Sequence, residues 1–290
     1  MKFHPLINNY ASATAQFSFC SHFECNSYSH SRRRAFVFLI FNMERWANCT
    51  AVVTGASSGI GVAIVKDLLK ANMKVAGLGR RKERMEELRA TLAEDQQKLF
   101  YPVACDVSSL ESVNAAFDWI IKNLSGVDVL VNNAGIYNVG QASTMNPVEI
   151  QQVIQTNVMG VVYCTQRAFK SMKERSVDGH VVIINSVVGH YVPQNDAQTT
   201  PTSNLYAPSK YALTALTEVY RQEFRGLGTR VKITSVSPGL TDTDMVAARS
   251  RGGKKPILQP EDVSSCVLFT LSTPAHMQVH EITVKPMMGE

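Results

Sequence analysis

The sequence predicts an α/β fold: one doubly wound parallel sheet of about seven strands with helices on both faces. Two observations lead to this prediction. Apolar, β-rich runs recur along the chain, and several are apolar throughout, as expected for strands covered on both faces. Stretches with helical periodicity lie between them, which implies right-handed βαβ units. The expected strands are 51–54, 74–78, 99–104, 127–131, 180–185, 230–236 and 280–284.

Length and charge favour one domain after an N-terminal extension. The 290 residues are 45% apolar, enough for one large core. Residues 1–42 hold four basic residues against one acidic residue, which gives +3 of the net charge of +5. The other 25 basic and 23 acidic residues give only +2, without a basic stripe that would indicate nucleic-acid binding. We expect 1–42 to be a poorly ordered extension and 43–290 to be one domain, with Met43 as a natural start.

The extension carries no convincing targeting or membrane signal. Its apolar run, 35–41, has seven residues, whereas a transmembrane helix needs about twenty. The run also lies too far into the chain for a secretory signal, and the three arginines before it are clustered, unlike those of a mitochondrial presequence. The six cysteines, at 20, 25, 49, 105, 164 and 266, form no C-x-x-C pair and no metal spacing with the seven histidines. We therefore expect reduced thiols, no metal site and a cytoplasmic location.

Three expected helices have recognisable start signals. Ser108 with Glu111 three residues later predicts a capping box before an apolar-periodic stretch. Asn146 followed by Pro147 predicts the start of a helix over 147–172. Pro260 opens the last long helix.

A glycine-rich turn at 55–61 joins the first strand to the first helix, as in Rossmann-type sheets. Its glycines, Gly55, Gly59 and Gly61, permit positive φ and close approach, so backbone amides can bind a phosphate at the helix N-terminus. The pattern alone is also compatible with an ordinary tight turn. The turn residues expected to bind the cofactor are Gly55, Ser57, Ser58, Gly59, Ile60 and Gly61.

The end of the second strand bears on the choice of cofactor. In dinucleotide-binding folds an acidic residue near this point binds the ribose 2′-hydroxyl, whereas arginine accommodates a 2′-phosphate. Here Gly79 stands at that point and Arg80 and Arg81 follow. This favours NADP(H) over NAD(H). The alternative is that both arginines only begin the next solvent-exposed helix.

Later strand ends carry further candidate cofactor contacts. Asp106 can accept a hydrogen bond from an adenine amine, or cap the next helix. The small residues after the fourth strand suit a wall against a flat ligand. The Pro-Gly pair after the sixth strand forces a turn, and the hydroxyls beyond it can reach a cofactor. These candidates are Asp106, Val107, Asn133, Ala134, Gly135, Pro238, Gly239, Thr241 and Thr243.

Four polar residues form the candidate catalytic set. Asn157 lies within a predicted helix, where asparagine is mildly unfavourable, and nearby Gly160 costs about 1 kcal/mol relative to alanine. The pair indicates a kink or a functional polar contact. Ser186 ends the fifth strand, at the edge where open α/β sheets bind ligands. Tyr206 and Lys210 are four residues apart, so they share one helical face, although such a pair also arises by chance on an exposed face.

Taken together, these motifs resemble those of the short-chain dehydrogenase/reductase family over all of 43–290. The motifs are Thr54-Gly-x-x-x-Gly-x-Gly61, Asp106, Asn132-Asn-Ala-Gly135, Asn157, Ser186, Tyr206-x-x-x-Lys210 and Pro238-Gly239. The chain is also similar to the branch that holds insect farnesol dehydrogenases and a vertebrate hydroxysteroid dehydrogenase/carbonyl reductase. Segments 43–46, 171–175, 214–218 and 272–276 carry this likeness.

The resemblance implies a role for each catalytic candidate. Tyr206 exchanges the proton at the substrate oxygen, and Ser186 hydrogen-bonds that oxygen. Lys210 lowers the pKa of Tyr206 and binds the nicotinamide ribose, so Tyr206 and Lys210 also count as cofactor-binding residues. Asn157 positions a water that links Lys210 to solvent.

The expected activity is hydride transfer between NADP(H) and an apolar alcohol or carbonyl, as in farnesol dehydrogenase. A steroid or general carbonyl reductase, or a non-catalytic NADP(H)-binding regulator, is the alternative. The loop between Ser186 and Tyr206 is longer than usual, the segment 244–258, a candidate flap, is shorter, and Thr241 replaces an aliphatic residue. These three departures bear on which substrate the protein binds. The family also implies a homodimer or homotetramer formed through the 111–124 and 147–172 helices.

Overall fold

The structure is a computed structural model that describes residues 43–193, 203–245 and 256–287. The predicted extension, 1–42, lies outside these residues. So do 194–202, within the long loop before Tyr206, and 246–255, within the candidate flap.

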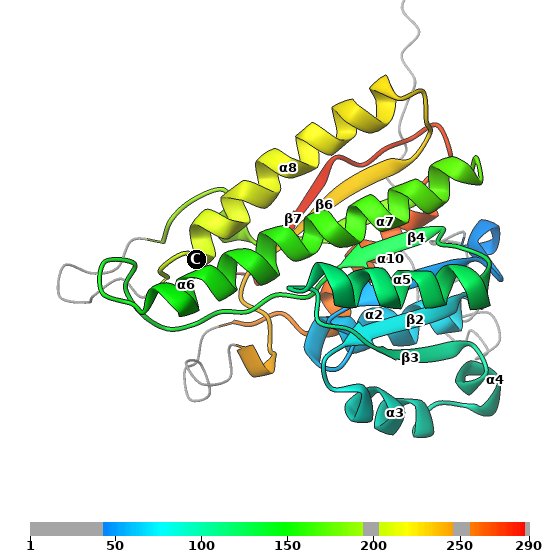
Figure 1. The fold of residues 1–290 in the computed structure, drawn as a ribbon, viewed down its shortest axis with the longest axis horizontal. Helices are drawn as coiled ribbons and strands as arrows, with labels where there is room; N and C mark the ends of the chain where they lie inside the picture. The colour runs from blue at the N-terminus through cyan, green and yellow to red at the C-terminus, as the bar shows by residue number, and fades with distance from the viewer. Residues whose placement is uncertain (1–42, 194–202, 246–255, 288–290) are drawn as a thin grey trace, which may run out of the picture. The chain divides into compact units, whose positions relative to one another are not determined.

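A seven-stranded parallel sheet forms the centre of the described chain (Figure 1). Its strand order is β3-β2-β1-β4-β5-β6-β7, which confirms the predicted doubly wound α/β fold. Each predicted run coincides with a strand, and the ends differ by at most two residues. The strands are β1 Thr50–Thr54, β2 Lys74–Gly79, β3 Phe100–Ala104, β4 Val129–Asn132, β5 His180–Ile184, β6 Lys232–Pro238 and β7 Glu281–Val284.

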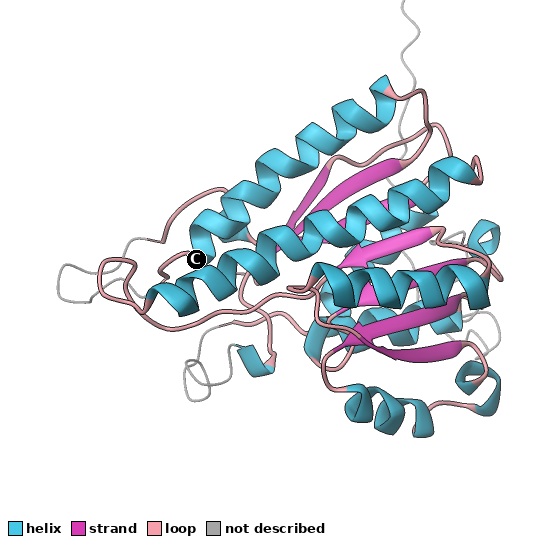
Figure 2. Ribbon diagram, in the orientation of Figure 1, coloured by secondary structure: helices cyan, strands magenta, loops and turns pink. Residues whose placement is uncertain are grey.

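Helices cover both faces of the sheet (Figure 2). None of those in the described ranges is long and apolar enough to cross a membrane. The longer helices are α2 Gly59–Lys70, α3 Lys82–Ala90, α5 Leu110–Leu124, α6 Pro147–Ile154, α7 Gly160–Glu174, α8 Tyr206–Gly226 and α10 Pro260–Ser272. The shorter ones are η1 Glu44–Trp46, α4 Glu94–Gln97, η2 Gln155–Met159 and η3 Val187–Gly189.

Two hydrophobic cores lie on opposite faces of the sheet. One packs α5, α7 and α8 against alternate strand residues such as Val52, and the other packs α2 and α10 against their neighbours, such as Val53. Successive strand side chains point to opposite faces, so a strand between two helical layers buries its side chains on both sides. This explains why strands such as β4 and β5 are nearly continuous apolar runs.

The helix starts agree with the predictions at two places and differ at one. Asn146 Oδ1 accepts a hydrogen bond from Val148 N at 2.9 Å, and Pro260 opens α10. The predicted cap Ser108 is wrong: Ser109 is the N-cap of α5 and accepts from Ser112 N. Ser108 instead donates its N–H and O–H to Asp106 Oδ1, at 3.0 and 2.7 Å, so it belongs to the turn after β3.

The predicted helix 147–172 is interrupted by the π-helical turn η2 between α6 and α7. Asn157 lies in this turn, and Gly160 follows it. A Cβ on Gly160 would lie 3.0 Å from Val107 Cγ2 and 3.1 Å from Val107 O. The glycine therefore allows the helix to approach the segment after β3, and the extra residue of the π turn changes the direction of Asn157.

Candidate active site

A cleft of about 820 Å³ lies at the carboxyl ends of the strands. Its lining contains every predicted site residue except Gly61 and Asn157, which lie behind it. The predicted residues that line it are Gly55, Ser57, Ser58, Gly59, Ile60, Arg80, Arg81, Asp106, Val107, Asn133, Ala134, Gly135, Ser186, Tyr206, Lys210, Pro238, Gly239, Thr241 and Thr243. Parallel strands bring their carboxyl ends to one edge, which is why residues so far apart in sequence meet here.

The glycine turn is a cradle that a side chain would fill. Gly55 and Gly59 have φ of +67° and +52°, which favour glycine. A Cβ on Gly55 would lie 2.9 Å from Ala134 Cα, and one on Gly59 would lie 2.9 Å from Thr243 Cγ2. Ser58, the N-cap of α2, makes no capping bond with its side chain. The first amides of α2 are thus available to an anionic group, and a dinucleotide pyrophosphate fits this chemistry.

Gly61 does not line the cleft, but it packs against the glycine turn. A Cβ at this position would lie 2.2 Å from Gly55 O, so only glycine lets α2 pack this close to the turn. Asn133 Nδ2 reaches the same place and donates to Thr54 O at 2.9 Å and to Gly55 O at 3.2 Å. The Asn133 side chain therefore shapes the cradle.

Thr54, at the end of β1, was predicted only as the first residue of the glycine motif, and the structure gives it a supporting role in this site. Its Oγ1 accepts the N–H groups of Asn133 and Ala134, at 2.9 and 3.0 Å. Its position directly before the glycines was the only feature of the sequence that indicated this role. The hydroxyl joins the ends of β1 and β4.

Arg80 and Arg81 line the cleft where β2 ends, and both are exposed. Neither has an ion-pair partner among the residues that the structure describes. The nearby Arg84 differs, since its Nη1 lies 3.9 Å from Asp244 Oδ2. Two unpaired guanidinium groups beside Gly79, and no carboxylate at that position, fit a phosphorylated ribose better than a plain one.

Part of the predicted hydrogen-bonding capacity is used within the protein. Asp106 Oδ1 accepts both hydrogen bonds from Ser108. Thr241 Oγ1 donates to Gly239 O at 3.0 Å, and Thr243 Oγ1 donates to Thr241 O at 3.4 Å. Direct contact of these groups with a cofactor stays a prediction.

Lys210 is a buried cation with spare donors. It is only 6% exposed, and its Nζ donates to Ile184 O at 2.9 Å. An ammonium group has three donors, so the remaining ones suit the hydroxyls of a bound ribose. Burial lowers the pKa of Lys210 to about 8. Its Nζ lies 5.7 Å from the centre of the Tyr206 ring, as the four-residue spacing predicted.

Tyr206 is the first residue of α8 and lies beside Ser186. The pKa of Tyr206 is raised to about 12, mainly by burial; the hydrogen bond with Ser186 lowers it and the interaction with Tyr137 raises it, both by less than burial does. The sequence reading expected Lys210 to lower this pKa. In the structure burial dominates instead.

Ser186 is held by the short helix that follows it. Its Oγ accepts from Val188 N at 3.3 Å and lies 3.5 Å from Pro238 O. Beneath it, Asn185 Nδ2 donates to Thr214 Oγ1 at 2.9 Å, and Thr214 Oγ1 donates to Gly189 O. These bonds fix the turn that carries Ser186 to α8.

Asn157 is 1% exposed and supports the cleft from behind. Its Oδ1 accepts from Ile136 N at 2.8 Å, and its Nδ2 donates to Ile136 O at 3.0 Å and to Ser209 Oγ at 3.1 Å. Ser209 in turn donates to Tyr206 O at 2.6 Å. Asn157 therefore joins the loop after β4 to the start of α8, and its predicted water contact stays a prediction.

Sequence reasoning missed two further residues beside Tyr206. The Tyr137 ring contacts that of Tyr206 edge-on, with centroids 5.1 Å apart and an interplanar angle of 87°. Asn204 Oδ1 accepts from Tyr206 N at 3.1 Å, and its Nδ2 donates to Asn138 O. No sequence signal indicated either contact, because both depend on segments that meet only in the folded chain.

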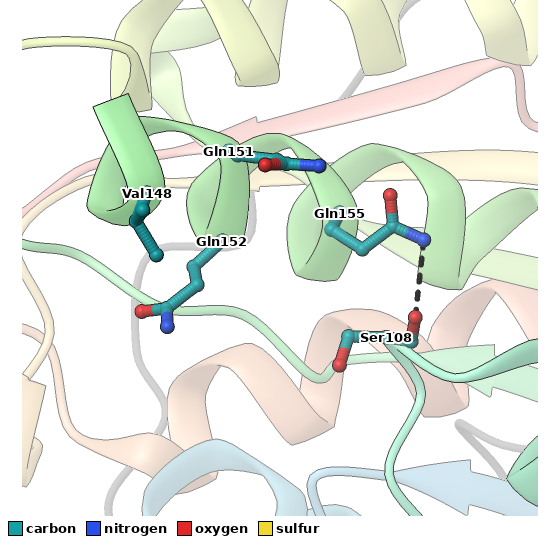
Figure 3. Close-up of a pocket in the computed structure, with 5 residues that line it drawn as sticks. All are labelled: Ser108, Val148, Gln151, Gln152 and Gln155. Carbon is teal, nitrogen blue, oxygen red and sulfur yellow. Dashed lines mark hydrogen bonds between the residues drawn. The ribbon is translucent and has the colours of Figure 1, made fainter.

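A second, smaller pocket of about 220 Å³ lies between Ser108 and α6 (Figure 3). Gln155 Nε2 crosses to Ser108 O at 3.0 Å. The five lining residues are uncharged: Ser108, Val148, Gln151, Gln152 and Gln155. This pocket therefore lacks the charge expected of a phosphate site.

Comparison with known proteins agrees with this geometry. Residues 49–253 match the family model for short chain dehydrogenase. The chain is 50% identical over 246 residues to a farnesol dehydrogenase of Aedes aegypti, covering 84% of this chain and 98% of that protein. It is 37% identical over 255 residues to dehydrogenase/reductase SDR family member 11 of Homo sapiens, covering 84% and 96%.

Solved structures show the same architecture. An alcohol dehydrogenase from Thermococcus sibiricus complexed with 5-hydroxy-NADP has a TM-score of 0.71 and 26% identity, covering 81% of this chain and 95% of that one. The closed form of a serine dehydrogenase complexed with NADP+ has a TM-score of 0.73 and 27% identity, covering 83% and 96%.

Proposed function

The chain belongs to the short-chain dehydrogenase family, and from that premise we propose that it is an NADP(H)-dependent oxidoreductase interconverting an apolar alcohol and its carbonyl. Farnesol dehydrogenase activity is the favoured form, because of the 50% identity with the Aedes aegypti enzyme. The observation that carries the proposal is the grouping of Ser186, Tyr206 and Lys210 in one cleft with the glycine turn.

NADP(H), when bound, supplies or accepts the hydride. The amides at the start of α2 would hold its pyrophosphate, and Arg80 and Arg81 its 2′-phosphate. Lys210 would donate to the nicotinamide ribose. The two arginines beside Gly79 in the cleft lining, and the NADP ligands of the two solved structures, support this choice over NAD(H).

Tyr206 exchanges the proton at the substrate oxygen in this proposal. In oxidation its phenolate accepts the alcohol proton, and in reduction its phenol donates to the carbonyl oxygen. Ser186 donates a hydrogen bond to the same oxygen and fixes its position. With a pKa of about 8, Lys210 is mostly protonated at neutral pH, so its charge favours the phenolate beside it.

The cleft lining also contains side chains that suit an apolar substrate. Apolar and proline side chains among them are Ile136, Val188, Pro193, Leu240, Met245 and Pro286. An isoprenoid chain can bury its surface against such residues. A steroid can do so as well, so the substrate assay includes both.

Replacing Tyr206 with phenylalanine tests the proposed function. We expect Tyr206→Phe to lose NADP(H)-dependent turnover of farnesol while binding NADPH as tightly as the wild type, because only the proton donor is removed. Absorbance at 340 nm measures turnover, and fluorescence titration measures binding. A variant that keeps its rate would refute the role of Tyr206. A wild type that binds NADPH but turns over no farnesol, steroid or dicarbonyl would favour the non-catalytic alternative.

We also propose that the protein forms a homodimer or homotetramer through α5 and α6–α7, as the family suggests. Two large apolar side chains on α5 support this surface, since Leu110 is 49% and Trp119 is 40% exposed. Such exposure is common at interfaces between subunits. A cytoplasmic location stays a prediction from the cysteine pattern; the four cysteines in the described ranges are unpaired.

A further inference from the structure

The loop between β4 and α6 presents Tyr137 directly to Tyr206. The two rings meet edge-to-face, a geometry that aromatic pairs favour, and both rings line the cleft. Tyr137 follows the small residues Ala134 and Gly135, which also line the cleft and are predicted to contact the cofactor. It therefore lies beside both a predicted cofactor contact and the proposed proton donor.

This loop is fixed on both sides of Tyr137. Before it, both backbone groups of Ile136 are hydrogen-bonded to the buried amide of Asn157. After it, Asn138 O accepts from Asn204, whose Oδ1 also holds Tyr206 N. Gly140 then forms a parallel bridge with Ser203. The same side chains therefore position the backbone of Tyr137 and the start of α8.

We propose that Tyr137 is a positioning and specificity residue of the active site. Its ring holds the Tyr206 ring in one orientation and contacts the part of the substrate next to the reacting carbon. This inference rests on the proposed function, because it takes the substrate oxygen to lie at the Tyr206 hydroxyl.

The geometry supports both parts of the proposal. A proton donor works only when its oxygen is held within hydrogen-bonding reach of the substrate, and small displacements cost large factors in rate. The two ring centroids are 5.1 Å apart and both rings line the cleft, so a substrate whose oxygen is bound at the Tyr206 hydroxyl is within reach of the Tyr137 side chain. Tyr137 can thus discriminate between substrates by their shape at this point.

The electrostatic surroundings of Tyr206 offer a separate readout. Lys210 faces it from α8, Ser186 from the end of β5, and Tyr137 from the loop after β4. The Tyr137 phenol raises the pKa of Tyr206, so its removal should lower that pKa. A purely structural role for the Tyr137 ring would leave the pH profile unmoved.

Two variants of Tyr137 separate these roles. We expect Tyr137→Leu, which loses the ring, to lower kcat/KM for farnesol at least about tenfold, with an altered ratio between farnesol and a steroid and an unchanged Kd for NADPH. Tyr137→Phe keeps the ring, so it should retain most of the rate while its kcat/KM profile for oxidation shifts to lower pH. Tyr211→Leu is the matched control, because Tyr211 is 41% exposed on α8 and does not line the cleft.

The outcomes distinguish this inference from the proposed function. An active wild type with Tyr137→Leu matching Tyr211→Leu in rate and substrate ratio would overturn the inference and leave the function intact. An unmoved pH profile in Tyr137→Phe would overturn the electrostatic part. A wild type without turnover overturns both. Thermal melting and NADPH titration show whether Tyr137→Leu is folded, and if it is not, the rate and pH profile of Tyr137→Phe decide.

Discussion

Replacing Arg80 with alanine tests the choice of cofactor. If Arg80 binds the 2′-phosphate, its loss must weaken NADPH and leave NADH nearly unchanged, because the two differ only in that phosphate. Arg80 and Arg81 have no ion-pair partner in the described part of the chain, so a phosphate need not displace a carboxylate.

The expected rise in the Kd for NADPH depends on the solvent exposure of Arg80 and Arg81. A hydrogen bond to a charged group contributes about 1.5–3 kcal/mol, and solvent exposure places this one at the lower end. About 1.5 kcal/mol corresponds to roughly a tenfold higher Kd for NADPH, and the Arg80→Ala/Arg81→Ala double variant to about a hundredfold if the two contributions add.

The assay compares Kd and KM for NADPH and NADH at one ionic strength, since salt screens exposed charges. Arg84→Ala is the matched control, because Arg84 lies on α3, directly after Arg80 and Arg81, does not itself line the cleft and is paired with Asp244. Equal losses for NADPH and NADH in Arg80→Ala would refute the phosphate argument. An equal loss of NADPH affinity in Arg84→Ala would show a general effect of positive charge rather than a bond from Arg80 to the 2′-phosphate.

Three other variants test the cradle, the buried cation and the subunit surface. Gly61→Ala, which forces a Cβ within 2.2 Å of Gly55 O, should abolish binding of either nucleotide, whereas Gly226→Ala, with open space around it, should bind normally in the same titration. Lys210→Met should abolish turnover but raise the melting temperature at pH 7 by a few degrees. Burial lowers the pKa of Lys210 from 10.5 to about 8, so unfolding between these two pH values takes up a proton, and wild-type stability should rise from pH 8 to 10.5 where that of the variant does not. Trp119→Glu should shift the wild-type oligomer toward monomer in light scattering, and an unchanged mass would exclude α5 from the interface.

Most of the fold could be predicted from the sequence because local and long-range signals agree. A run such as 129–131 is apolar at each position since both faces are buried, and the glycines and prolines beside such runs mark their ends. The family motifs then identified the residues that line the cleft. These patterns depend on sequence spacing alone.

The structure differs from the sequence predictions at places where a contact from a distant part of the chain determines the local structure. The spacing of Ser108 to Glu111 predicted Ser108 as the cap, but the Asp106 carboxylate binds Ser108, which leaves the cap to Ser109. Asn157 and Gly160 indicated a misfit in their helix, yet the π turn depends on the Ile136 backbone and on Val107.

The environment of Tyr206 also depends on such contacts. Tyr137 lies in a loop without periodicity, so its contact with Tyr206 is visible only in the folded chain. The pKa of Tyr206 is set mainly by burial, which spacing to Lys210 does not reveal.

The hydrogen bonds of Thr54 have a consequence for how the molecule unfolds. They join β1 to the end of β4, across a sequence separation of 79 residues, at the seam where the strand order reverses. A nucleotide bound there would contact segments from both sides of the seam at once. It would then act as a ligand-dependent crosslink, so that both halves of the sheet unfold in a single transition whose midpoint rises with nucleotide concentration.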